Sequence, residues 1–551
     1  MPPLVFYCII ASAIPSQHIH ERHQNMQLLD RVRYHCQERP DTPALIGSTN
    51  PGKSVTFGQL WSYSSSIAAY LHETLPVNND PVIVYGHKSP LMLASFLGCM
   101  RSGHAYVPID AYSVPKERVA SIAGQIREKA GNVAVLASLP LPESAEGSLD
   151  VMLTPPPLAL RDIANQGIPY NDEKTAISDE DLMYVIFTSG STGSPKGVQV
   201  TASCVDNFYP WALEFSQIDK PGMGFLNQAP FSFDLSVYEL TMALASGGTL
   251  LCLEKETLDH PADMLSFLNK VHPDIWVSTP SFADMCLANK DFRRELMPNL
   301  ATMVFCGETL TNQTAGKLLD RFQGLRIMNT YGPTESTVAV TSVEVSKEMI
   351  ESPEPLTVGK PRTGTRIHIA NSDGNDLLPG EWGEIVIEGD TVAKGYFGRS
   401  DLTAQSFGES DGSWLPAQRD SVRYYRTGDE GMLDPLGQLH FRGRLDLQVK
   451  LNGYRIELGE IEERLCALEQ VAAACVVPAY RNEKLAHLVA YVVSGAHRDQ
   501  SDFQEGLALK DALKSSLPHY MIPKKIVFID ALPVTPNGKL DRKLLASQNK
   551  A

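Results

Sequence analysis

The stretch from Thr188 to Gly197 combines residue types that could bind a polyphosphate. It reads Thr-Ser-Gly-Ser-Thr-Gly-Ser-Pro-Lys-Gly and follows an apolar run, residues 182–187, that is typical of a strand buried on both faces. Glycines let the backbone approach a ligand, successive N–H groups can face an anion, and the hydroxyls and Lys196 add donors. It is not a Walker loop, because proline precedes and glycine follows the lysine. The alternative is a flexible surface linker, which rarely follows a buried strand directly.

One carboxylate, Asp234, stands in an otherwise apolar segment that runs from Phe231 to Val237. A buried aspartate is costly unless a partner neutralises it or hydrogen-bonds to it. It could cap the N-terminus of a helix, which is a common role for aspartate. It could also be the counter-ion of an ammonium group on a substrate. The residues of this segment leave both interpretations open.

Two further segments carry carboxylates beside residues that could bind a nucleotide. Residues 329–335 read Asn-Thr-Tyr-Gly-Pro-Thr-Glu, in which Thr334 could bond a phosphate and Glu335 could hold Mg²⁺. The Pro-Thr-Glu end could instead cap a helix. Residues 425–429 end on Asp429, whose two carboxylate oxygens suit two neighbouring hydroxyls of a ribose.

Near the C-terminus, residues 533–541 form a turn that bears Lys539, and residues 443–450 form a charged run. By themselves, an exposed lysine beside a glycine and a run of charges usually belong to a solvated surface. A placed cation would, however, stabilise the negative charge that builds on a phosphorus atom under attack.

Alternating strands and helices must position these residues. Strands are predicted at residues 81–86, 105–110, 182–187, 248–253, 275–278, 303–306 and 326–329, with a helix over residues 89–102. This rhythm predicts parallel sheets, whose strands point their carboxyl ends at the ligand. Residues 26–80 are predicted to be helical and the Pro-rich residues 155–169 to be a loop. The predicted fold class is α/β, a large N-terminal domain with mostly parallel sheets and helices, followed by a small α+β domain.

The composition is that of a globular protein with more than one domain. The chain has 551 residues, 43% of them hydrophobic and 20% charged, and is too long for one ordinary core. Its net charge of −16 argues against nucleic acid or an anionic membrane as the main partner. Nine cysteines without metal-ligand spacing, and no apolar run of membrane-spanning length, predict reduced thiols and a cytoplasmic location. Residues 1–25 are expected to be a disordered or non-functional extension, since no basic residue precedes their short apolar run.

Five of these motifs, at residues 188–197, 329–335, 425–429, 443–450 and 533–541, together resemble the adenylate-forming superfamily of acyl-CoA synthetases, luciferases and the adenylation domains of peptide synthetases. The resemblance covers Met26 to Leu545. It implies a large domain over residues 26–444 that holds ATP and Mg²⁺, a small mobile domain over residues 445–551, and a hinge at Asp446. The catalytic residues it implies are Lys196, Glu335, which also holds the metal, and Lys539, which swings into the site. The ATP-binding residues it implies are Thr188, Ser189, Gly190, Ser191, Thr192, Gly193, Asn329, Thr330, Tyr331, Gly332, Pro333, Thr334, Asp429, Phe441, Arg442, Gly443, Arg444 and Lys539.

Within the superfamily, residues 227–237, 276–286 and 305–308 look like those of the D-alanine–D-alanyl carrier protein ligase family. The resemblance implies that Asp234 holds the substrate ammonium group. It also implies a tight apolar pocket for a methyl side chain, formed by Leu235, Cys306 and Val338. The chain departs from the expected pattern at Tyr238, in an insert around residues 410–421 that is expected to be a loop, and in the N-terminal extension.

The function that the resemblance implies is ATP-dependent activation of a small amino acid, D-alanine, as aminoacyl-AMP. The aminoacyl group is then transferred to the phosphopantetheine thiol of a separate carrier protein. Another small amino acid of secondary metabolism remains an alternative substrate. An acyl- or aryl-CoA ligase, which would not need Asp234, and a non-catalytic nucleotide-binding protein are further alternatives. The expected partners are the amino acid and the carrier protein, with neither nucleic acid nor membrane, and a monomer is expected.

Overall fold

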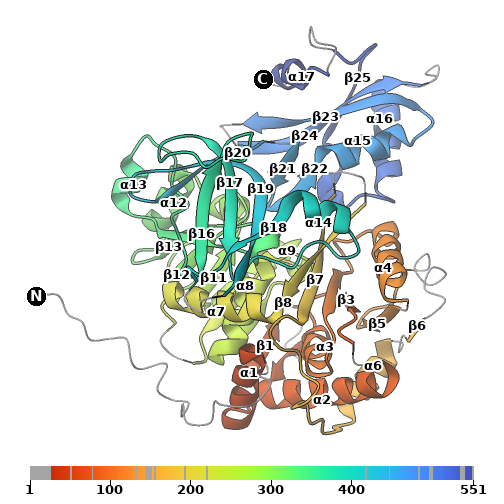
Figure 1. Ribbon diagram of the computed structural model, residues 1–551, viewed down its shortest axis with the longest axis vertical. Coiled ribbons are helices and arrows are strands. Elements are labelled where there is room, and N and C mark those ends of the chain that lie inside the picture. The colour runs from red at the N-terminus through yellow and green to blue at the C-terminus, as the bar shows by residue number, and fades with distance from the viewer. Residues whose placement is uncertain are drawn as a thin grey trace, which may run out of the picture.

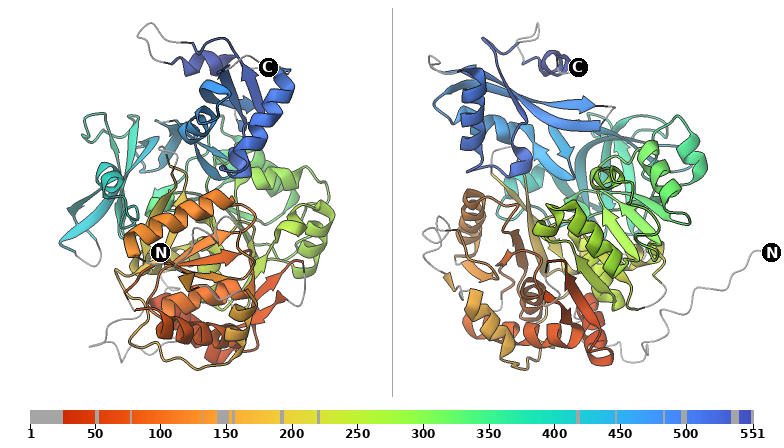
Figure 2. Two further views of the ribbon diagram at one scale, coloured as in Figure 1. Left: turned by 90° about the vertical axis from the view of Figure 1, so that its right-hand side faces the viewer. Right: turned by 180° about the vertical axis from the view of Figure 1, so that it is seen from behind.

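The computed structural model describes residues 26–49, 53–76, 78–131, 133–142, 152–153, 157–190, 194–218, 221–415, 419–445, 447–481, 484–495, 501–533 and 540–548. These residues form three sheets with their helices, and two smaller sheets that follow them in the chain (Figure 1). Figure 2 shows from two further sides that the C-terminal part lies at one end of the molecule, opposite the N-terminal helix α1 (Gln27–Glu38).

A six-stranded sheet, in the order β6-β5-β3-β4-β7-β8, carries the predicted phosphate-binding stretch. Alternate residues of β3 enter two different cores, Val82 and Val84 on one face and Ile83 and Tyr85 on the other, as the two-residue period of a strand requires. Its strands are β3 (Val82–Gly86), β4 (Tyr106–Asp110), β5 (Val133–Ala137), β6 (Met152–Leu153), β7 (Leu182–Thr188) and β8 (Lys196–Thr201). The helices beside it are α2 (Phe57–Thr74), α3 (Pro90–Arg101), α4 (Lys116–Ala130) and α6 (Pro157–Asn165).

A nine-stranded sheet, in the order β15-β14-β13-β12-β11-β9-β10-β1-β2, is parallel in its centre from β13 to β1. Its strands are β1 (Pro43–Gly47), β2 (Val55–Thr56), β9 (Gly224–Asn227), β10 (Thr249–Cys252), β11 (Ile275–Ser278), β12 (Thr302–Phe305), β13 (Arg326–Tyr331), β14 (Thr341–Glu344) and β15 (Lys360–Pro361). The helices of this region are α7 (Ala202–Ser216), α8 (Leu235–Ser246), α9 (Lys255–Leu258), α10 (Pro261–Val271), α11 (Pro280–Leu287), α12 (Asn312–Arg321) and α13 (Lys347–Glu351).

A five-stranded antiparallel sheet completes the large domain. It holds β16 (Thr365–Ala370), β17 (Gly383–Gly389), β18 (Phe407–Asp411), β19 (Ser421–Leu433) and β20 (Leu439–Arg444), with helix α14 (Ser400–Ser406) beside it. This sheet ends at Arg444, where the domain boundary is predicted.

The C-terminal part has a core of its own around Ile456, Ile461 and Val476. Its strands are β21 (Gln448–Leu451), β22 (Tyr454–Glu457), β23 (Val471–Arg481), β24 (Lys484–Ser494) and β25 (Lys525–Phe528), and its helices are α15 (Leu458–Cys466), α16 (Asp502–Leu513) and α17 (Arg542–Ser547). In Figures 1 and 2, α17 lies on the side that faces away from the large domain.

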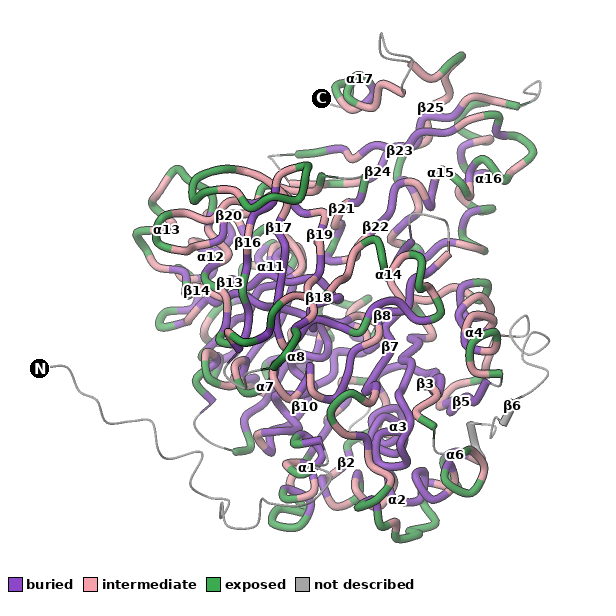
Figure 3. Tube along the Cα trace, in the orientation of Figure 1, coloured by how far each residue is buried: buried purple, intermediate pink, exposed green. Residues whose placement is uncertain are grey.

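Central helices and strands of the large domain are buried along most of their length. Figure 3 shows α3 and β7 in purple within the large domain, and every residue of α8 except Ser246 is buried. Among the described residues, no helix is both long and apolar enough to cross a membrane.

The predicted α/β class and each predicted strand are confirmed, with shifts of at most two residues at the ends. Three local predictions are wrong. Residues 26–80 contain strands β1 and β2, the expected loop at residues 155–169 contains α6, and the expected loop around residues 410–421 contains the end of β18 and the start of β19. The loop at residues 155–169 was predicted from its prolines. Pro157, however, occupies the first position of α6, where a missing N–H costs nothing.

Candidate active site

Asp234 lies at the N-terminus of α8, but its carboxylate does not cap the helix. Its side chain accepts no capping hydrogen bond, so that interpretation is wrong. Instead, the Thr334 hydroxyl donates to Asp234 Oδ2 over 2.6 Å, and only 8% of Asp234 is exposed. Burial raises the pKa of Asp234, while the Thr334 bond and the charges of Lys450 and Arg455 act against that shift. Among the described residues no cation pairs directly with this carboxylate, which leaves it suited to a cationic ligand.

Two of the three predicted pocket residues contact each other, and the third, Leu235, follows Asp234 directly in the chain. Leu235, Cys306 and Val338 are each 3% exposed or less and belong to one core. The Cys306 thiol donates to the Val338 carbonyl over 3.6 Å. Burial raises the pKa of the Cys306 thiol, and the charge of Asp234 contributes in the same direction.

The backbone at Val338 is held in an unusual conformation. Thr337 and Val338 have φ values of 61° and 68°, in the left-handed region that β-branched residues rarely adopt. Gly332 allows this loop to pack closely, since a Cβ on it would lie 2.5 Å from the Ala339 Cα. Close packing therefore constrains the backbone of the loop that carries the predicted pocket residue Val338.

Tyr238, the residue that departs from the expected pattern, lies on the next turn of α8. Its ring packs edge-on against Phe208, with centroids 5.0 Å apart, and it is fully buried. Burial and the neighbouring Cys306 both raise the pKa of Tyr238. The residue belongs to the same core as Leu235, Cys306 and Val338.

Glu335 is fully buried in the 3₁₀ turn Thr334–Ser336. The Tyr396 hydroxyl donates to one oxygen over 2.8 Å, and Arg455 of the small domain donates to the other over 2.7 Å. Burial alone would raise the pKa of Glu335, but the charges of Arg455 and Lys196 outweigh it and hold the pKa at about 2. The carboxylate is therefore ionised, and this charge suits Mg²⁺, which takes one or two protein carboxylates together with phosphate and water oxygens. The described residues contain no group of three or more metal-ligating side chains.

The predicted phosphate loop joins two antiparallel strands, β7 and β8, rather than a strand and a helix. Its close packing needs Gly190, where a Cβ would lie 2.0 Å from the Ser194 carbonyl oxygen. Ser189, Gly190 and Lys196 all contact the small domain. Burial lowers the pKa of Lys196, with Arg455 acting in the same direction and Glu335 and Glu457 against it. Ser191, Thr192 and Gly193 lie outside the described residues.

Asp429 brings two predicted nucleotide residues together. The Tyr331 hydroxyl donates to its Oδ2 over 2.6 Å, and Arg444 donates to its Oδ1 over 2.8 Å. The Tyr331 and Phe441 rings lie 5.7 Å apart. Gly443 pairs with Glu430 in the β19–β20 ladder beside Arg444. Both carboxylate oxygens of Asp429, which are expected to bind a ribose, therefore accept a hydrogen bond from another predicted nucleotide-binding residue.

Several other residues that were predicted to bind ATP contact the protein scaffold rather than the residues described above. The Asn329 side chain donates to the Thr357 carbonyl and the Thr330 hydroxyl to the Phe305 carbonyl, so both bond to the protein scaffold. Pro333 occupies the N-cap position of the 3₁₀ turn of Glu335, without a side-chain capping hydrogen bond. Arg442 pairs with Glu430 over 3.2 Å and stacks on Trp382, and its side chain is 52% exposed, so it is not gathered with the others.

Asp446 and Lys539 lie outside the described residues. Helix α17, which follows Lys539 in the chain, is tied to the small domain by Arg542, which donates to Glu462 Oε2 over 2.7 Å. This helix faces away from the large domain (Figure 1). The arrangement therefore brings β21, β22 and α15 to the site, and sequence reasoning missed their residues Arg455, Glu457 and Glu460.

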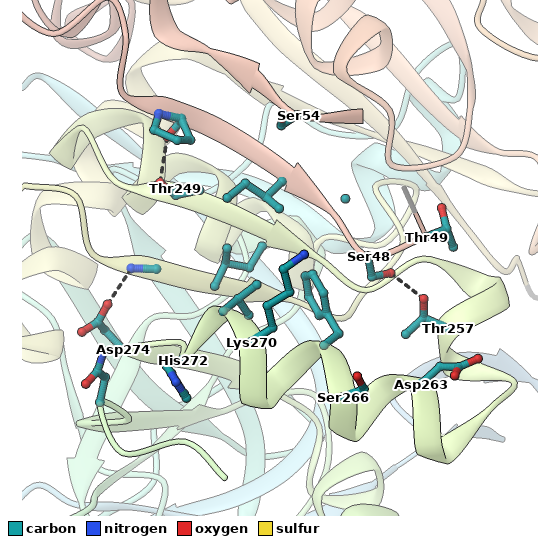
Figure 4. A pocket seen from close by; sticks show the side chains of 18 of the residues that line it. Ser48, Thr49, Ser54, Thr249, Thr257, Asp263, Ser266, Lys270, His272 and Asp274 are labelled. Carbon is teal, nitrogen blue, oxygen red and sulfur yellow. Dashed lines mark hydrogen bonds between the residues drawn. The ribbon is translucent and has the colours of Figure 1, made fainter. Parts of the chain in front are cut away.

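A separate hollow of about 1050 Å³ opens between α10 and strands β1 and β10 (Figure 4). Lys270 extends into it, and Ser48 donates to Thr257 at its rim over 2.7 Å. None of the predicted site residues lines it.

Comparisons with known proteins agree with this geometry. A family model described as AMP-binding enzyme matches residues 32–397, and one described as AMP-binding enzyme C-terminal domain matches residues 460–539. The D-alanine–D-alanyl carrier protein ligase of Bacillus cytotoxicus is 42% identical over 531 residues, which are 95% of this chain and 99% of that protein. The ligase of the same name from Bacillus licheniformis is 41% identical over 527 residues, with the same coverage.

Solved structures share the fold. PA1221, an NRPS protein containing adenylation and PCP domains, is 26% identical with a TM-score of 0.74, covering 96% of this chain and 98% of that one. The Vibrio cholerae adenylation domain AlmE, solved with glycyl-adenosine-5′-phosphate, has a TM-score of 0.73 at 22% identity, covering 96% and 99% of the two chains. The motifs, the fold and these matches together show that the chain belongs to the AMP-binding enzyme family of the adenylate-forming superfamily.

Proposed function

We propose that this enzyme activates D-alanine with ATP to form D-alanyl-AMP and then transfers the D-alanyl group to the phosphopantetheine thiol of a separate carrier protein. The observation that carries the proposal is the buried Asp234 carboxylate, which accepts a hydrogen bond from Thr334 and has no direct ion pair among the described residues. The names of the 41–42% identical relatives support the same substrate and acceptor.

In this proposal each set of site residues binds a different part of the two substrates. Asp234 pairs with the ammonium group, and Leu235, Cys306 and Val338 enclose the methyl group. Asp429 holds the ribose hydroxyls, and Ser189, Gly190 and Lys196 hold phosphates. Glu335 would hold Mg²⁺, which offsets phosphate charge when bound. The substrate carboxylate attacks the α-phosphorus and pyrophosphate leaves, while Lys539 stabilises the charge that develops.

The second half of the reaction needs the thiol to reach the carbonyl carbon of the mixed anhydride. The thiolate attacks this carbon and AMP leaves, which yields the thioester. We infer that the small domain turns about Asp446 between the two halves, so that one cleft serves both. We further propose that the enzyme acts as a cytoplasmic monomer.

An ATP–pyrophosphate exchange screen with D- and L-amino acids tests the substrate. We expect D-alanine to give the highest kcat/KM, ahead of glycine, L-alanine and D-serine. Exchange that depends instead on an aryl or fatty acid would refute the proposal, and a preference for another small amino acid would replace its substrate.

Replacing Cys306 by alanine should widen the pocket by about the volume of the sulfur atom. We expect kcat/KM for D-2-aminobutyrate relative to D-alanine to rise about tenfold, since one methylene in an apolar pocket is worth about 1–3 kcal/mol. Cys286→Ala is a matched control, because this thiol is equally buried but belongs to a different core. If the two variants showed the same selectivity between D-2-aminobutyrate and D-alanine, Cys306 would not line the pocket.

Replacing Asp429 by asparagine should raise the KM for ATP about tenfold and leave the KM for the amino acid nearly unchanged. The amide offers one acceptor oxygen in place of two and no longer attracts Arg444. Asp434→Asn, in a turn of the same sheet, is the control. An unchanged KM for ATP would contradict the assignment of the ribose to Asp429.

A further inference from the structure

Lys88 is a buried cation that the proposed reaction leaves without a role. It is 1% exposed, and its Nζ donates to three backbone carbonyls, those of Asn227 over 3.2 Å, Gln228 over 2.6 Å and Leu253 over 2.8 Å. Burial lowers the pKa of Lys88 to about 8, so at neutral pH the ammonium group is still protonated and has one hydrogen for each carbonyl. Because all three acceptors are backbone groups, Lys88 fixes the path of the chain at these positions.

Lys88 joins the two large sheets at the ends of their strands. It follows β3 of the six-stranded sheet, whereas Asn227 is the last residue of β9 and Leu253 follows β10 of the nine-stranded sheet. The carboxyl ends of parallel strands are where such sheets place their ligands. From Asn227 the chain continues through residues 228–233 to Asp234, so the lysine holds the beginning of the segment that carries this carboxylate.

The segment that starts at Asn227 is closed by a hydrogen bond across Asp234. The Asn227 side-chain amide donates to Glu239 Oε1 of α8 over 2.8 Å and to the Ala229 carbonyl over 3.1 Å. Asn227 and Glu239 are both fully buried, and Asp234 lies between them in the chain. A displacement of Asn227 would therefore also pull on the first turns of α8, which begins directly after Asp234.

Helix α3 holds the same segment from the side of Lys88. The Phe231 ring packs edge-on against Phe96 of this helix, with centroids 5.5 Å apart. Lys88 stands directly before Ser89, the N-cap of α3, and has a φ of 40°, a value that residues other than glycine rarely adopt. Such a strained backbone persists only where its surroundings enforce it, and it is frequent at functional sites. The three hydrogen bonds of Lys88 are part of what enforces it.

We propose that Lys88 is a positioning residue for the amino-acid site, because it holds residues 227–234 in the path that presents Asp234 to the substrate ammonium group. The proposal rests on the proposed function, in which Asp234 pairs with that group. Lys88 acts through the backbone of this segment. None of its three hydrogen bonds goes to a residue that is predicted to bind ATP. Loss of the ammonium group should therefore weaken binding of the amino acid and spare binding of ATP.

Replacing Lys88 by methionine keeps the length of the side chain but removes the ammonium group. In ATP–pyrophosphate exchange with D-alanine, we expect the KM for the amino acid to rise at least about tenfold, because only a fraction of the molecules would then hold Asp234 in place. The KM for ATP and the kcat at saturating D-alanine should stay within about twofold of wild type. Lys88→Gln, whose amide offers two hydrogens, should give an intermediate KM for D-alanine.

Arg101→Met is the matched control, because Arg101 is an equally buried cation at the other end of α3 and donates to Asp172 over 2.6 Å. This variant should lose thermal stability and keep the KM of both substrates. An unchanged KM for D-alanine in both Lys88 variants, or equal rises in the KM of both substrates, would overturn the proposal. KM does not depend on how much of the enzyme is folded, so a variant of low stability still gives an answer. Absence of exchange with any amino acid in wild type would instead refute the proposed function, and this inference with it.

Discussion

Replacing Asp234 by asparagine should lower kcat/KM for D-alanine in ATP–pyrophosphate exchange by about 10³-fold. The carboxylate is buried, and among the described residues it has a hydrogen bond from Thr334 but no direct ion pair. Removing it would leave the substrate ammonium group buried without a counter-ion, a loss of about 2–5 kcal/mol. A factor of 10³ corresponds to about 4 kcal/mol.

The asparagine variant removes the negative charge of the side chain but keeps its size and shape. Its amide oxygen can still accept the bond from Thr334, so the start of α8 should fold unchanged, and ATP binding should stay near the wild-type value. Asp263→Asn removes the same charge at an exposed position of α10, which holds none of the predicted residues, and serves as the control. Wild-type exchange in Asp234→Asn would rule out an amino acid held at this site.

Replacing Lys539 by alanine should slow D-alanine adenylation by about 10²–10³-fold. A cation aimed at the charge that develops on the phosphorus acts only in the transition state, and removal of one such group typically costs this much. Transfer from preformed D-alanyl-AMP to the carrier thiol involves no pentacoordinate phosphorus. We therefore expect that half-reaction, followed by thioester formation on the isolated carrier protein, to proceed at nearly the wild-type rate.

Lys543→Ala is the matched control for Lys539, because this exposed lysine lies four residues further on, in α17. It should leave both half-reactions unchanged. If Lys539→Ala slowed both halves equally, the residue would support the small domain rather than the chemistry of adenylation.

The sequence predicted the fold best where patterns were local. The buried runs at β3, β4 and β11 each gave a strand, because continuous apolar residues between turn signals leave few alternatives. Strand β8 was missed, since Lys196–Thr201 begins with the lysine and glycine of a loop motif and only its pairing with β7 makes it a strand. Strands β1 and β2 were missed for a related reason, because they are short and their partners lie far along the chain.

For the site, too, the sequence predicted the residues in local motifs and missed those that only tertiary contacts bring in. Asp234 and Cys306 were singled out because their motifs are compact, and the structure buries both and places Cys306 in contact with Val338. Arg455, Glu457 and Glu460 were missed because their partners lie more than a hundred residues away. No local spacing signals such a contact. A lone arginine after a tyrosine and two glutamates at the start of a helix are ordinary surface features until tertiary packing gives them partners.

The left-handed backbone at Thr337 and Val338 limits how this enzyme could change its preference over evolutionary time. A β-branched residue in that conformation is strained by about 1–3 kcal/mol and persists only because its surroundings enforce it. Gly332 and Ala339 pack against this loop too closely for it to shift gradually. In descendants that accept other amino acids, side chains on β12 and α8 would therefore change first, while the backbone conformation at Thr337 and Val338 would be retained.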